Sequence, residues 1–220
     1  MIGCPSRLAW LLLLALLTTS SASALSITVV PDADGWVKTW GTNEVDTAGD
    51  TLVLSRSGGL QKRVILEFDL DDIPEGATID SVVLAVVKNG TMSNTGGNPV
   101  PNHLSGYPGD GTVLIGDHDT AGTNVGDFAE TLGLANGSEI VWTLTSVVPL
   151  QDAMDSANDL LTLQIVTDSF AILHLVSLET ATAHAPPELR IEYTSVPEPS
   201  TLLLLSLGLV AMIAAKRRRR

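Results

Sequence analysis

Short apolar segments that alternate with polar residues are the feature that most limits how this chain can fold. In the segment 63–70, Val64, Leu66 and Phe68 fall on one face of an extended strand, and the charged residues fall on the other face. No long stretch between residues 25 and 195 shows the apolar spacing of an amphipathic helix. The pattern therefore predicts half-buried strands.

Similar short, strand-like apolar segments occur along the rest of residues 25–195, separated by turns that contain Gly, Asn and Pro. The further predicted strands are 26–30, 51–55, 81–88, 111–115, 139–145, 160–167, 170–178 and 188–194. One short helix is predicted over 145–157, capped by Thr145 or Ser146. The Gly- and Asn-rich stretch 89–111 is predicted to be a long surface loop inside one domain. Strands without alternating helices predict an all-β, antiparallel β-sandwich.

The N-terminal segment has the three parts of a secretory signal peptide. Arg7 precedes an apolar run at 8–17, and Ala22 and Ala24 occupy the small-residue positions of a cleavage site. An apolar run this short, at about 1.5 Å per residue, spans roughly half of a hydrocarbon core, which argues against a permanent anchor. We expect residues 1–24 to form a signal helix that signal peptidase removes before Leu25.

The C-terminal segment 196–220 also has three parts. They are Pro197, Glu198 and Pro199, an apolar run at 202–215, and the basic cluster Lys216, Arg217, Arg218, Arg219 and Arg220. The apolar run is long enough for a single short transmembrane helix, and the basic cluster would stop translocation and stay in the cytoplasm. The domain would thus be held outside the membrane by its tail.

This order of parts resembles the PEP-CTERM sorting signal of bacterial exosortase substrates. The resemblance implies that an exosortase-type membrane protease cuts the precursor near Pro197 to Pro199. The domain would then reach the cell surface or the extracellular space. The alternative is a tail anchor that is never cut.

Charge and cysteine content exclude several functions for the segment 25–195. It holds 24 acidic and 6 basic residues, a net charge of −18, which would repel nucleic acid. The single cysteine, Cys4, lies in the predicted signal peptide. The mature part therefore has no disulfide framework and no cysteine-based metal site or nucleophile.

The middle segment resembles a known family of domains. The strand 63–70, the following stretch 73–84 and the segments 177–179 and 187–193 are similar to the DNRLRE-type jelly-roll domain. The resemblance implies a jelly roll over 25–195, in which Phe68 is a core residue and Asp69 caps a turn. Some domains of this type act as carbohydrate-binding modules, so extracellular polysaccharide is a candidate partner.

Two sets of side chains are candidates for ligand binding. Asp117 and Asp119 alternate in an extended or turn conformation and, with Glu130, suit a calcium ion; the alternative is a solvated acidic loop. Asp32 and Asp34 repeat this spacing with a weaker claim. Trp36, Trp40 and Tyr107 are candidate platforms for sugar rings, with ordinary packing as the alternative. Phe68, Phe170 and Tyr193 are predicted to be core residues.

No catalytic motif emerges from the sequence. The histidines are dispersed and lack zinc-binding spacing (His103, His118, His174 and His184), and no G-x-S-x-G elbow is present. The leading hypothesis is a non-enzymatic, exported surface or matrix protein that binds polysaccharide. The alternatives are a polysaccharide lyase or hydrolase, and a purely structural protein of a surface assembly.

Overall fold

The computed structural model describes residues 24–39, 41–90, 92–94, 99–130, 133–180, 184–195 and 208. Ala22 and most of the predicted signal helix, Trp40, and the sorting parts (Pro197, Glu198, Pro199, Lys216, Arg217, Arg218, Arg219 and Arg220) lie outside the described residues. In the part of the chain that the structure describes, no helix is long and apolar enough to cross a membrane.

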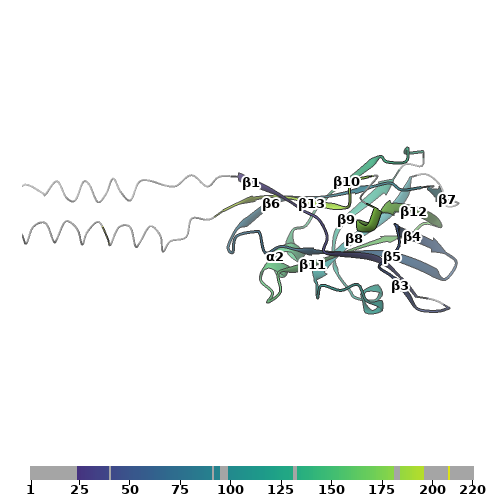
Figure 1. Cartoon of the computed structure of the whole chain (residues 1–220), viewed down its shortest axis with the longest axis horizontal. Helices are drawn as coiled ribbons and strands as arrows, with labels where there is room; N and C mark the ends of the chain where they lie inside the picture. Colours follow the sequence, from purple (N-terminus) through teal and green to yellow (C-terminus); the bar gives the residue numbers. More distant parts are fainter. Residues whose placement is uncertain are drawn as a thin grey trace, which may run out of the picture.

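Two antiparallel sheets form the domain (Figure 1). The strands are β1 (Ala24–Val29), β2 (Ala33–Thr39), β3 (Glu44–Asp46), β4 (Thr51–Ser57), β5 (Leu60–Asp69), β6 (Thr78–Val87), β7 (Ser93–Asn94), β8 (Val100–Pro108), β9 (Thr123–Glu130), β10 (Glu139–Thr143), β11 (Leu160–Thr167), β12 (Ala171–Val176) and β13 (Glu188–Thr194). Sheet A has the order β1-β13-β6-β10. Sheet B has the order β7-β12-β4-β5-β11-β8-β9, and β2 joins it by pairing with β5 and β3. The architecture is consistent with the predicted antiparallel β-sandwich.

The main core lies between the two sheets and contains the apolar faces that the alternation predicts. Val64, Leu66 and Phe68 of β5 are fully buried in it, and so is Trp142 of β10. Phe128 of β9 stacks on Trp142, with ring centroids 5.4 Å apart. This contact joins one strand from each sheet where sheet B ends at β9 and sheet A ends at β10.

A second, smaller core explains an exception in the strand pattern. Ile65 breaks the alternation of segment 63–70, yet it is fully buried. It packs with Val37 and Val113. Val113 belongs to residues 109–122, which we call the covering segment because it packs on strands β2 and β5. Both faces of β5 are therefore buried over part of its length.

Two predictions for the region 89–130 are wrong, and one strand there was not predicted. Residues 111–115 are not a strand; they lead into the short 3₁₀ helix η1 (Ile115–His118). The predicted loop 89–111 contains β7 and all of β8, and β9 was not expected. β8 carries Pro101, Asn102 and Gly106, which are depleted in strands and hide its pattern. It lies between β9 and β11, whose pairing fixes it as a strand.

Two smaller expectations also differ from the structure. The helix α2 (Val148–Met154) is shorter than the predicted 145–157, and it begins after Val147. Thr145 does not cap it, because the Thr145 hydroxyl donates to the carbonyl of Val125 instead, at 2.9 Å. Phe170, predicted to be core, is 52 % exposed, whereas Phe68 and Tyr193 are buried as expected.

Candidate functional site

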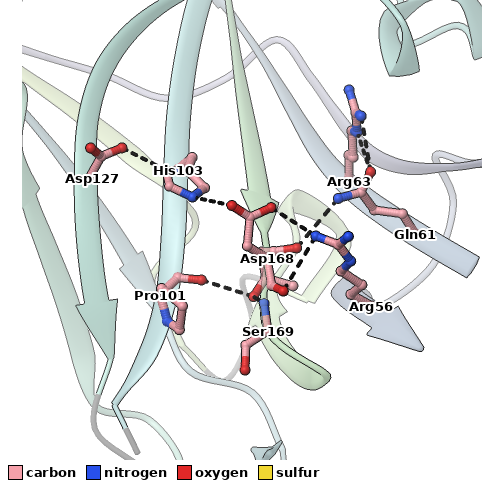
Figure 2. Close-up of polar contacts among 9 residues, drawn as sticks. Arg56, Gln61, Arg63, Pro101, His103, Asp127, Asp168 and Ser169 are labelled. Carbon is pink, nitrogen blue, oxygen red and sulfur yellow. Dashed lines mark hydrogen bonds and ion pairs between the residues drawn. The ribbon is translucent and has the colours of Figure 1, made fainter. Parts of the chain in front are cut away.

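Strands β4, β8 and β9 and the turn after β11 bring four charged side chains together, which we call the polar shelf (Figure 2). His103 on β8 lies opposite Asp127 on β9 in the strand register. Its Nδ1 is 2.6 Å from Asp127 Oδ1, and its Nε2 is 2.6 Å from Asp168 Oδ2. Arg56 on β4 donates to the other oxygen of Asp168, with 3.0 Å between the atoms. The shelf is partly exposed to solvent.

The two carboxylates favour the charged form of His103. The hydrogen bond to Asp127 is the largest cause that raises the His103 pKa, and Asp168 adds to it against partial burial. The same bond, with a second from Asn124, lowers the pKa of Asp127. Each ring nitrogen of His103 faces a carboxylate oxygen at 2.6 Å, so neither nitrogen faces an open position from which it could accept a proton from a substrate. The polar shelf can present charged hydrogen-bonding groups to a ligand, but it does not present a free histidine base.

A second set of polar contacts fixes the covering segment against sheet B. Arg63 of β5 donates to the carbonyl of His118, and Gln164 of β11 donates to the carbonyl of Asp117 at 2.5 Å. Both acceptors belong to η1. Gln164 and His118 are buried. The side chains next to the polar shelf thus have a structural role, which is to hold η1 on the sheet.

A buried carboxylate lies under the start of the covering segment. Glu67 is 1 % exposed. It accepts hydrogen bonds from the Thr162 hydroxyl and, at 3.2 Å, from the backbone N–H of Gly111. Burial raises the Glu67 pKa, and these two bonds oppose the rise. Glu67 therefore ties β5, β11 and the covering segment together.

The predicted calcium residues have separate partners. Asp117 accepts hydrogen bonds from the Tyr107 hydroxyl at 3.1 Å and from the Leu114 N–H at 2.6 Å. Asp119 accepts one from His118 at 2.7 Å, which lowers the Asp119 pKa. An extended or turn conformation was expected here; Asp117 lies in the 3₁₀ helix η1, and Asp119 follows it directly. The side chain of Glu130 lies outside the described residues. Among residues that the structure does describe, no group of three His, Cys, Asp or Glu side chains is placed to hold a metal.

The predicted sugar platforms have different surroundings from one another. Trp36 is only 6 % exposed, and the amine of Lys62 lies 3.4 Å from its ring centroid. Its ring is therefore packed, which was the alternative to a sugar platform. Tyr107 is half-buried, and its hydroxyl is held by Asp117. The sequence did not indicate the exposed ring of Phe170, two residues after Asp168 in the turn between β11 and β12.

Two shallow grooves lie elsewhere on the described surface. One, of about 360 Å³, crosses the outer face of sheet A and is lined by Ser26, Thr28, Ser81, Arg190 and Glu192, among others. The other, of about 430 Å³, lies between the β5–β6 turn and the end of α2 and is lined by acidic residues that include Asp71, Glu75, Asp155 and Asp159. The charge of Asp69 is the largest cause that raises the Asp71 pKa there. Neither groove contains the polar shelf.

Comparison with known proteins identifies the C-terminal end of the chain. No curated protein matches the sequence. The resemblance of the middle segment to the DNRLRE-type domain has no family match to support it and stays a prediction. Residues 195–220 match the family model described as the PEP-CTERM protein-sorting motif, directly after β13 ends at Thr194.

Proposed function

We propose that this protein is an exported β-sandwich that is sorted through its C-terminal segment to the cell surface or the extracellular matrix. The observation that carries this proposal is the sorting motif at 195–220, which starts one residue after the last strand of the folded domain. The motif implies processing by exosortase, a membrane protease, from a membrane-anchored precursor.

The proposed route has two cuts. Signal peptidase would remove residues 1–24 during export, and exosortase would cut near Pro197 to Pro199 once the C-terminal helix is in the membrane. The first cut falls at the start of β1, whose first residue is Ala24. The intact mass of the chain recovered from the cell surface tests the proposal, because each cut removes a defined piece.

The finer part of the proposal is a non-catalytic, polysaccharide-binding role. The occupied nitrogens of His103 support a non-catalytic role, since a histidine base needs one nitrogen free. The polar shelf and the exposed ring of Phe170 support polysaccharide binding, because sugar rings stack on aromatic faces while charged groups take their hydroxyls. The net charge of −18 on residues 25–195 favours a neutral polymer over an anionic one.

Replacing Phe170 with alanine is expected to weaken binding to a neutral polysaccharide about tenfold, the loss of one stacking contact. Affinity electrophoresis of the processed chain in gels with neutral or acidic polysaccharides measures this. Val141→Ala is the matched control, because Val141 is also about half exposed but lies on sheet A. An unchanged Phe170→Ala variant would exclude this ring as the platform. If no polysaccharide retards the original chain, the structural role remains, and release of sugar fragments from the polymer would favour the lyase or hydrolase alternative.

A further inference from the structure

The last strand of the domain is held on both sides. β13 pairs with β1 from Leu189 to Thr194 and with β6 from Glu188 to Thr194. Within the described ranges, β1 is an edge strand whose one neighbour is β13. β13 is therefore flanked by two hydrogen-bonded ladders and β1 by one.

Side chains on the outer face reinforce β13. Arg190 forms ion pairs with Glu139 of β10, at 2.5 Å, and with Glu188, at 3.0 Å. The Ser81 hydroxyl of β6 donates to Glu192 at 2.9 Å. The hydroxyl of Thr194 donates to Asp80 of β6 at 2.8 Å. On the inner face, Leu189, Ile191 and Tyr193 are buried in the main core. Both faces of β13 are thus attached to the rest of the sandwich.

The chain enters and leaves the sandwich at the same end. Ala24 at the start of β1 pairs with Thr194 at the end of β13. The hairpin between β4 and β5 lies at the opposite end (Figure 1). Tension between that hairpin and either terminus would therefore act along the strand axes, and the strand being pulled would have to slide past its neighbours. Pulling on the C-terminus loads two ladders, and pulling on the N-terminus loads one.

We propose that β13 is a mechanical anchor, which lets the domain stay folded under tension applied through its C-terminus. The inference rests on the proposed function, because it needs the C-terminus to be the point of attachment, first in the membrane-held precursor and then at the surface. The N-terminal strand carries no such load, because signal peptidase leaves its end free. This matches the placement of the weaker edge strand at the N-terminus and the doubly paired strand at the C-terminus.

Single-molecule pulling tests this inference with a built-in control. The only cysteine, Cys4, is removed with the signal peptide, so introduced cysteines provide unique attachment points. One variant carries Ser57→Cys at the far hairpin with Ser195→Cys, and the other carries Ser57→Cys with Leu25→Cys. The exported chain is pulled in the same direction in both variants. The first rupture force should be about twice as high through residue 195 as through residue 25, because two ladders break instead of one.

A second comparison tests the side-chain contacts of β13. Asp80→Ala combined with Ser81→Ala, which removes both β6 side chains that bond to β13, should lower the rupture force measured through residue 195 and leave that measured through residue 25 unchanged. Equal forces through the two termini in the original sandwich would overturn the inference. That outcome would leave the sorting proposal intact, because the masses of the processed chain test the latter separately. An uncut chain at the surface would refute exosortase processing but would leave the rupture forces of the sandwich unchanged.

Discussion

Replacing Asp34 with asparagine is expected to stabilise the folded domain by about 2–4 kcal/mol at pH 8 and to change its stability little at pH 4. Asp34 lies on β2 and is 3 % exposed. Burial raises its pKa to about 7; the hydrogen bond from the Leu178 N–H opposes the rise, and the nearby carboxylate of Glu179 adds to it. The buried carboxylate therefore stays protonated until the pH approaches 7, and its ionisation above that pH destabilises the folded state.

The direction of the pH effect follows from this raised pKa. Between pH 4 and pH 7 the folded chain keeps a proton on Asp34 that the unfolded chain has lost. The stability linked to that proton is complete below the unfolded pKa and is lost as the pH rises through about 7. Asparagine keeps an oxygen to accept from Leu178, at 2.8 Å in the original chain, and carries no charge at any pH. The gain should therefore appear only as the pH rises.

Urea unfolding of the exported chain at pH 4, 6 and 8 measures the effect. Asp32→Asn is the matched control, because Asp32 carries the same charge two residues away but is exposed. Its stability difference from the original chain should stay within about 0.5 kcal/mol at each pH, as for most surface substitutions. A destabilised Asp34→Asn variant at pH 8 would show that the ionised carboxylate makes contacts worth more than the burial of its charge.

Replacing Gly109 with alanine is expected to destabilise the domain by about 2–4 kcal/mol. A Cβ at this position would lie 2.3 Å from Glu67 Oε2 and 2.8 Å from the Thr162 hydroxyl. Glu67 and Thr162 are buried and bonded to each other, so neither can move away without breaking that bond. The change would displace the start of the covering segment and open the small core around Val113.

Gly116→Ala is the matched control for this prediction. Gly116 belongs to the same covering segment, but an added Cβ there would meet nothing within 4 Å. Thermal unfolding of the two variants should show a clear fall in the midpoint for Gly109→Ala and almost none for Gly116→Ala. Equal midpoints would mean that the contact between Glu67 and the covering segment contributes little to the fold.

The strands that were predicted are those that carry an apolar residue at every second position over most of their length. The segments 160–167 and 188–194 were predicted with the bounds that the structure gives. β8 was missed because its inner face includes Asn102 and Gly106, which interrupt the alternation of apolar and polar residues. Gly106 is needed there because Pro149 of α2 packs against it, 2.9 Å from where a Cβ would lie. Asn102 is 1 % exposed, so burial at this position came from the sheet and not from residue type.

The polar shelf could not be predicted, because pairing between distant strands creates it. His103 and Asp168 are 65 residues apart in the chain, and Arg56 and Asp168 are 112 apart. Local spacing instead drew attention to Asp117 and Asp119, which are neighbours in sequence but bind different partners. The sorting motif was predictable because its parts are contiguous and each has a composition that a membrane or a protease can recognise directly.

The intact mass of the chain isolated from the native cell surface tests the central claim most directly, because it fixes both ends at once. The account predicts a chain that starts at Leu25 and ends between Pro197 and Pro199, alone or with the added mass of a covalently attached group. The full apolar and basic tail through Arg220 should be found only in the membrane-bound precursor. A surface chain that retains residues 200–220 would contradict processing at the sorting motif.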